Sequence, residues 1–185
     1  MILSRSSSNN VVLGIVNACM GIGGIIGGLL VSVKKENRKK ANVIYISAAI
    51  SFLLGDLTMA IGRNVFFWSF AAFAASLPIP FITAEQNVIL YKKIPEKIQG
   101  RVFAVRNAVQ YSTIPLGILL GGYLADYIFE PFMRSDTDIV SLLEILVGNG
   151  AGSGMAVMFL CTGVCGFAMS ILSLYSKKIQ ELNNC

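Results

Sequence analysis

The stretch from Val11 to Val33, VVLGIVNACMGIGGIIGGLLVSV, decides the fold because it runs for 23 residues without a charged side chain. An α-helix of about 20 apolar residues is long enough to cross the hydrocarbon core of a bilayer, which is about 30 Å thick. A surface helix of a soluble protein would need a polar face along its length. The stretch therefore predicts a transmembrane helix.

Four further stretches have the same character, each with at most one charged residue: Val43–Gly62, Asn64–Leu90, Val102–Ala125 and Met155–Ser176. Charged residues make up only 14% of the chain, whereas a soluble domain has about 25%, and the mean hydropathy is +0.68. We therefore predict an all-α membrane protein with five transmembrane helices. Its transmembrane domain covers residues 11–176, between a short amino-terminal segment, 1–10, and a carboxy-terminal tail, 177–185.

The composition excludes several classes of function. The chain has no histidine, which removes every Ser-His-Asp or Cys-His mechanism and every histidine-bound metal. Three of the four cysteines lie within the apolar stretches, where a thiol behaves as a small hydrophobic group. The formal net charge of +5 is not gathered on a soluble face, as nucleic-acid binding would require. We expect no catalytic residue, no metal, no cofactor and no nucleic-acid partner.

The polar segments between the apolar stretches indicate the orientation, because lysine and arginine accumulate on the cytoplasmic side of a membrane. Five crossings place three basic residues on one side, namely Arg5, Arg63 and Arg134. The other side receives eleven: Lys34, Lys35, Arg38, Lys39, Lys40, Lys92, Lys93, Lys97, Arg101, Lys177 and Lys178. We predict a cell-membrane protein with its amino terminus outside and its carboxy terminus in the cytoplasm.

The two ends of this topology point to a fragment. Residues 1–10 are polar and lack the apolar core of a signal peptide. An odd number of crossings that starts outside, with no signal for export, is what remains when an upstream span is lost. The sequence therefore predicts that the chain is part of a larger membrane protein.

Two connecting segments have predictable structure. Residues 91–101 form a basic loop in which Pro95 and Gly100 are expected to break the helix. The external loop, 127–154, contains Ser135-x-x-Asp138, which resembles a capping box. Apolar residues then follow with helical spacing, at Ile139, Leu142, Leu143 and Leu146. They predict a short amphipathic helix on the membrane surface, followed by a glycine-rich hinge at 148–154.

Several short motifs between positions 78 and 133 occur in the order of a known family. They are QGRVF at 99–103, T-x-P-L at 113–116, LAD at 124–126 and FEP at 129–131, which contain the family-motif residues Gly100, Arg101, Pro115, Asp126, Glu130 and Pro131. The block resembles the carboxy-terminal half of major facilitator superfamily transporters, in the drug–proton antiporter branch that includes macrolide efflux proteins. The glycine-rich first span with its basic loop also fits this resemblance.

The resemblance implies a fold and an activity. Folds of this superfamily have two six-helix halves, so the five spans would be the last five of about twelve. It implies a secondary transporter that exports small amphipathic compounds, such as macrolides, in exchange for protons. Its partners would be the lipid bilayer and the missing amino-terminal half. The alternative is a truncated membrane fragment that does not transport and serves as an assembly or interaction partner.

Ionisable residues within the spans are candidates for proton coupling, since such groups are costly in a bilayer and usually face other helices or water. Asp56 either binds and releases a proton or is an interfacial carboxylate that reaches the headgroups from about 9 Å below Gly62. Glu85, Gln86 and Asn87 follow two prolines that favour a kink. They either line a substrate or proton path, or Glu85 pairs with loop lysines.

A stripe of polar and small residues follows one face of the fourth span at helical spacing: Arg106, Gln110, Thr113, Gly117 and Gly121. Its glycine end should allow close helix packing, and its polar end should face the protein interior. Arg106 either reaches the cytoplasmic headgroups or forms an ion pair with Glu85 that acts as an inner gate.

The glycines of the first span are spaced for helix packing rather than for phosphate binding. Gly23 with Gly27, and Gly24 with Gly28, form small-xxx-small pairs within an apolar run that no strand precedes. We expect these pairs to lie against a neighbouring helix.

Overall fold

The computed structural model describes residues 1–6, 8–33, 40–135 and 137–176, and these residues form helices joined by short turns, with no strand among them. Within the described residues, five helical spans are long and apolar enough to cross a membrane: Asn10–Val33, Ala41–Ile61, Val65–Lys93, Glu96–Phe132 and Ser153–Leu174. The shortest has 21 residues, or about 31 Å at 1.5 Å per residue. The all-α membrane class is thereby confirmed, and the basic loop 34–39 and the tail 177–185 lie outside the described residues.

Three of the spans are composed of more than one helical segment. The helices in chain order are α1 (Ile2–Arg5), α2 (Asn10–Val33), α3 (Lys40–Ile50), the π-helix η1 (Ser51–Asp56), α4 (Leu57–Ile61), α5 (Val65–Ser76), α6 (Ile79–Lys93), α7 (Glu96–Leu124), the π-helix η2 (Ala125–Phe129), α8 (Glu130–Phe132), α9 (Asp138–Val147) and α10 (Ser153–Leu174). The predicted kink is present between α5 and α6, where Pro78 and Pro80 supply no backbone N–H to the helical ladder.

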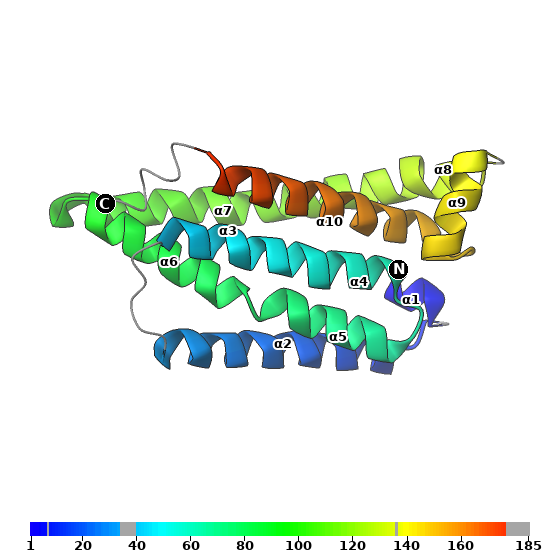
Figure 1. The fold of residues 1–185 in the computed structure, drawn as a ribbon, viewed down its shortest axis with the longest axis horizontal. Coiled ribbons are helices and arrows are strands. Elements are labelled where there is room, and N and C mark those ends of the chain that lie inside the picture. Colours follow the sequence, from blue (N-terminus) through cyan, green and yellow to red (C-terminus); the bar gives the residue numbers. More distant parts are fainter. Residues whose placement is uncertain (7, 34–39, 136, 177–185) are drawn as a thin grey trace.

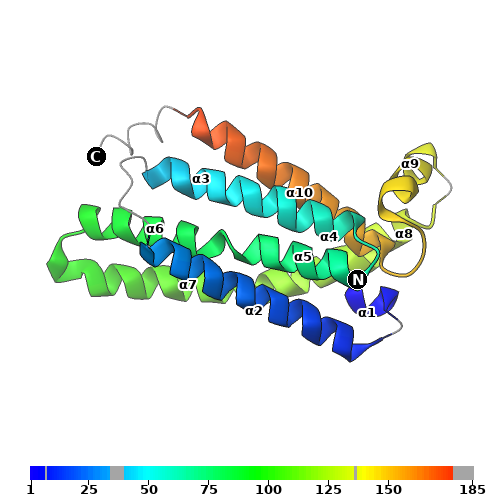
Figure 2. The same ribbon diagram turned by 60° about the horizontal axis from the view of Figure 1, so that its bottom comes forward.

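The spans lie roughly along one direction, and segments far apart in sequence pack side by side (Figure 1). α2 packs against α5 and α6, α3 packs against α6 and α10, and α10 also packs against η1, α4 and η2. α1, α8 and α9 gather at one end of the bundle, and the junction of α6 with α7 lies at the opposite end (Figure 2). We name these the α9 end and the α7-start end.

Small residues allow the spans to approach closely, as is usual between membrane helices. A Cβ added to Gly23 would overlap the side chain of Ser76 and lie 2.6 Å from the carbonyl oxygen of Phe73 on α5. A Cβ added to Gly27 would overlap the carbonyl oxygen of Leu77. Around Gly24 and Gly28, by contrast, nothing lies within 4 Å. One predicted pair therefore forms the α2–α5 contact, and the other faces away from the described chain.

The fourth span is longer than the sequence predicts. α7 begins at Glu96, directly after Pro95, and runs through Gly100 without a break. One glycine costs a helix about 1 kcal/mol, which does not stop a helix of 29 residues. The span then continues through η2 and α8 to Phe132, so the first residues of the predicted external loop are helical.

The predicted amphipathic helix is present as α9, at the end of the bundle. Its amino-terminal cap is Thr137, and the capping box predicted from Ser135 does not form, because the Ser135 hydroxyl donates to the carbonyl of Phe132 at 2.7 Å. Val140 and Val147 are buried against α10, while the predicted apolar residues Ile139 and Leu142 face outward.

Candidate functional site

The polar residues predicted within the spans lie at two separate places in the bundle. The first is at the contact between α6 and α7, near the α7-start end. There the guanidinium of Arg106 donates from Nη1 to Oδ1 of Asn87 at 2.7 Å and from Nη2 to Oε1 of Gln86 at 3.0 Å. Both donors are charged, so these bonds are stronger than neutral ones. The pair of amides fixes the guanidinium across the helix hairpin.

The same end of the hairpin has further contacts that hold α6 and α7 together. Nε2 of Gln99 donates to the carbonyls of Ile94 at 2.9 Å and Tyr91 at 3.3 Å. The ring of Tyr91 also packs on Phe103, with centroids 4.7 Å apart. The two helices are therefore joined where the chain turns, and Arg106 joins them again further along.

These bonds differ from the predicted ion pair between Arg106 and Glu85. Within the described residues, the partners that the structure shows for Arg106 are the two amides that follow Glu85 on α6. Glu85 itself is half-buried on α6. Gln110, the next residue of the predicted stripe, is exposed on α7. Gln86 and Asn87 thus become binding partners of Arg106 rather than free lining groups.

The second place is the carboxylate of Asp56, where η1 meets α10. Asp56 is the last residue of the π-helix, and Oδ2 accepts a hydrogen bond from the Thr162 hydroxyl at 3.4 Å. A Cβ added to Gly163 would lie 3.1 Å from the Cβ of Asp56, so this glycine permits the close approach of the two helices. π-Helical turns occur frequently at functional sites. Asp56 is a half-buried carboxylate at the contact between two spans.

A cavity of about 400 Å³ lies between Met1 with α1, α2, α4, α10 and the end of α7 with η2. Its lining is apolar, and Met59, Met155 and Met158 contribute flexible side chains that adapt to ligands of different shape. Gly121 and Gly122 form the α7 side of this cavity. The cavity has no signal in the sequence, because its four methionines, which include Met1, come from distant segments and show no common spacing.

The glycine end of the predicted α7 stripe does not pack closely against another helix of the chain. No atom lies within 4 Å of a Cβ added to Gly117 or Gly121. Only 6% of the most apolar part of this span is buried, whereas the other spans have 22–28%. The middle of the stripe, from Gln110 to Gly117, therefore faces open space in the described structure, with the cavity at its end.

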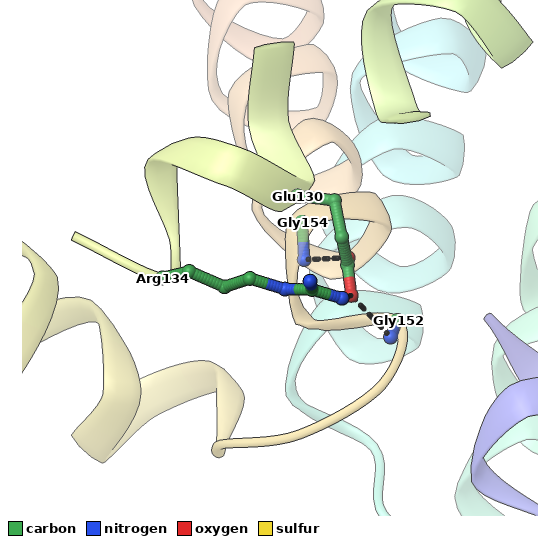
Figure 3. A network of polar contacts seen from close by, with 4 residues as sticks. All are labelled: Glu130, Arg134, Gly152 and Gly154. Atoms are coloured by element: carbon green, nitrogen blue, oxygen red, sulfur yellow. Dashed lines mark hydrogen bonds and ion pairs between the residues drawn. The ribbon is translucent and has the colours of Figure 1, made fainter. Parts of the chain in front are cut away.

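The family-motif residues lie along α7, η2 and α8, and one of them has a clear structural role. The carboxylate of Glu130 accepts hydrogen bonds from the backbone N–H groups of Gly154 at 3.1 Å and Gly152 at 3.3 Å, at the start of α10 (Figure 3). Arg134 lies 3.9 Å from the same carboxylate. A negative group at the amino-terminal end of a helix is stabilising.

The glycines of the segment 148–154 explain why this contact forms. Gly152 has a φ of +84°, which favours glycine, and a Cβ on Gly154 would lie 2.6 Å from the carbonyl carbon of Phe129. The predicted hinge is therefore a tight junction of α8 with α10. The other motif residues are Gly100, Arg101, Pro115 and Asp126, all exposed on α7 or η2, and Pro131, exposed on α8.

Among known proteins, the chain is similar to two that are named as efflux proteins. The chain is 30% identical over 110 residues to macrolide efflux protein A of Streptococcus pyogenes, an alignment covering 57% of this chain and 26% of that protein. It is 26% identical over 126 residues to multidrug efflux pump Tap of Mycolicibacterium fortuitum, covering 62% of this chain and 28% of that protein. No protein-family model and no solved structure matches the chain. The chain thus spans about a quarter of the length of the curated relatives it matches.

Proposed function

We propose that this chain is part of a multi-pass transporter that exports small amphipathic compounds, with macrolide-like drugs as substrates and protons as the coupling ion. The names of its relatives support efflux, and the superfamily resemblance supports a larger protein with a further helical half. In this proposal the five spans are the last five of a major facilitator superfamily fold. The working cavity then lies between this chain and the half that precedes it.

The observation that carries the proposal is the exposed stripe of α7, which leads from Arg106 and Gln110 to the methionine-lined cavity. A side-chain amide costs about 2–7 kcal/mol in an apolar medium when it has no hydrogen-bond partner. Such a face is unfavourable against lipid, so it fits a surface that other helices or water cover. A polar route beside an adaptable apolar cavity suits an amphipathic substrate.

The proposed proton carriers are Asp56 and Glu85, the two carboxylates within the predicted spans. Asp56 has a hydroxyl partner on α10, so a change of its protonation state alters the contact between two spans. Glu85 directly precedes the two amides of α6 that bind Arg106. Intramembrane carboxylates are functional candidates by default, because they are otherwise costly.

The proposed orientation places the α7-start end in the cytoplasm. Lys92, Lys93, Lys97 and Arg101 belong to the end of α6 and the start of α7, at one end of the bundle (Figure 1). Arg5 and Arg63 lie at the α9 end, which is then outside. The bias of basic residues toward the cytoplasmic side supports this orientation.

The test is a fusion of this chain to the preceding part of macrolide efflux protein A, expressed in a macrolide-sensitive bacterium. We expect the fusion to lower the accumulation of radiolabelled erythromycin, and we expect Arg106→Ala to abolish that effect. Asn107→Ala is the matched control, because Asn107 is the exposed neighbour of Arg106 on α7. A fusion that reaches the membrane but leaves accumulation unchanged would contradict transport and favour the second candidate, an assembly partner that does not transport. The exposed face of α7 is the observation that favours this second candidate.

A further inference from the structure

The α9 end of the bundle holds two arginines, Arg5 and Arg63, that belong neither to the proposed substrate and proton path nor to the family motifs. Arg5 donates from Nη2 to the carbonyl of Val147 at 2.8 Å and from Nη1 to that of Gly62 at 3.4 Å. Arg63 donates from Nη2 to the carbonyl of Ile145 at 3.2 Å. Both guanidiniums thus lie at the carboxy-terminal end of α9, where cations are stabilising. Each guanidinium has five N–H groups, so these bonds leave donors for a further acceptor.

The two arginines face the same polar pocket. Its volume is about 330 Å³, and Ser4 and Asn149 complete its polar lining. Burial, and then the like charge of Arg63, lower the pKa of Arg5, whereas the charge of Glu130 raises it. The Glu130 carboxylate is itself bound to two backbone N–H groups of the α8–α10 junction. The pocket therefore presents two positive charges close enough to repel one another, which an anion would stabilise.

An apolar groove shares Arg63 with this pocket. The groove has a volume of about 680 Å³ and runs along η1, α4 and the start of α5 to α9, past Leu53, Leu57 and Phe67. Arg63 lines both the groove and the polar pocket. A cationic site thus borders, at Arg63, a mainly apolar groove that is lined by two membrane spans.

The position of these features matches the boundary between headgroups and hydrocarbon. Arg63 lies in the turn between the second and third spans, and basic residues at the ends of spans usually reach the headgroup region. α9 exposes Ile139, Leu142 and Ile145 on its outer side, as a helix that lies in the membrane surface does.

We propose that the α9 end binds one anionic phospholipid, with its phosphodiester on Arg63 and Arg5 and an acyl chain in the groove along Leu53 and Leu57. A free anion would use only the polar pocket, and a neutral lipid would use only the groove. The continuity of the two through Arg63 is what selects a molecule that has both a phosphate and a tail. The proposal does not depend on transport or on the orientation of the chain.

The single tryptophan of the chain provides a reporter at this site. Nε1 of Trp68 donates to the carbonyl of Gly62 at 2.9 Å, and Gly62 lines the groove. Bromine atoms on an acyl chain in the groove should therefore quench the Trp68 emission. The experiment uses the whole chain in vesicles of phosphatidylcholine that contain increasing fractions of dibrominated phosphatidylglycerol, or of dibrominated phosphatidylcholine.

We expect phosphatidylglycerol to occupy the site at about 5- to 30-fold lower mole fraction than phosphatidylcholine, about fivefold for each arginine near an anionic phosphate. Arg63→Gln should reduce the preference for phosphatidylglycerol by a factor of about five or more. Arg134→Gln removes the same charge at the same end of the bundle and should leave the preference unchanged. Equal quenching by the two lipids in the wild-type protein would overturn the proposal, and that comparison needs no variant. An equal loss of preference in both variants would also overturn it.

Two further measurements distinguish lipid binding from the binding of a free anion and from a change of fold. If inorganic phosphate at about 20 mM abolishes the preference while the ionic strength is held at about 0.15 M, the pocket takes a free anion and the lipid proposal is wrong. Because both arginines also hold α9, the emission maximum of Arg63→Gln is compared with that of the wild type in pure phosphatidylcholine. A shifted maximum means that the fold has changed, and Arg63→Lys then replaces it. Retention of most of the preference in Arg63→Lys supports a charge-based site, and complete loss contradicts it.

Discussion

The two glycine pairs of α2 provide a direct test of the packing between the first and third spans. The Cβ of Gly27→Ala would overlap the carbonyl oxygen of Leu77 and lie 3.1 Å from its carbon and 3.2 Å from Cγ of Pro80. The first two of these are backbone atoms, so relief requires α2 and the α5–α6 junction to separate by several tenths of an ångström. The Cβ of Gly28→Ala meets nothing within 4 Å, one residue further along the same helix.

The expected difference between the two variants follows from this geometry. Overpacking of a well-packed contact costs about 1–3 kcal/mol. The gain in helix propensity, about 1 kcal/mol, is common to both substitutions and cancels in the comparison. We therefore expect the free energy of unfolding of Gly27→Ala to be lower than that of Gly28→Ala by about 1–3 kcal/mol, which is roughly a 5- to 150-fold difference in the unfolding constant.

The assay is titration of the purified protein in mild detergent with sodium dodecyl sulfate, followed by the emission of Trp68. That side chain is buried between α5 and Val16 of α2, so its emission reports separation of the two helices. The midpoint should fall for Gly27→Ala and should stay or rise for Gly28→Ala. Equal midpoints, or a lower midpoint for Gly28→Ala, would refute the assignment of the packed face.

Three further predictions concern the polar contacts and the orientation. Glu130→Ala should lower the free energy of unfolding by about 1–2 kcal/mol, as loss of other helix caps does, while exposed Asp126→Ala should change it by less than about 0.5 kcal/mol in the same titration. Arg106→Ala should cost about 1.5–3 kcal/mol through its two charged hydrogen bonds, with exposed Arg101→Ala as the control; equal effects would contradict the α6–α7 contact. In a variant whose only cysteine is Cys185, a membrane-impermeant thiol reagent should label the protein only after cell lysis, and rapid labelling of intact cells would reverse the proposed orientation.

The spans could be predicted from sequence because crossing a bilayer is a local requirement on length and polarity. Each apolar run had to become a helix, since no water is present to bond its backbone. The interruption between α5 and α6 was also local, because Pro78 and Pro80 remove two donors wherever they occur. The amphipathic α9 followed from spacing alone, although the cap at Thr137 rather than Ser135 did not.

The contacts between spans could not be predicted in the same way, since they depend on the relative positions of distant segments. The sequence SFLLGD does not indicate that residues 51–56 form the π-helix η1. The contacts of η1 are with a distant segment, since Gly55 lies against Ala75 and the Ser51 hydroxyl donates to the carbonyl of Ala75 at 2.8 Å. The sequence also does not show which glycine pair of α2 packs against α5, because Gly23 with Gly27 and Gly24 with Gly28 have the same spacing. Arg106 bonds to Gln86 and Asn87, and sequence alone could not select these partners, because a rotation of one or two residues along α6 changes which side chain faces α7.

The position of α7 is the part of the fold that the chain itself determines least. At one end Arg106 and Gln99 join it to α6, and at the other end Glu130, beyond η2, joins it to α10. Between these ends the hydroxyl of Thr113 bonds to the carbonyl of Val109 within the helix at 2.6 Å, so it needs no outside partner. The exposed amide of Gln110 does need one, because lipid offers no hydrogen bond. In the proposed transporter, the surface that covers Gln110 would therefore also hold the middle of α7, which leads to the methionine-lined cavity at Gly121.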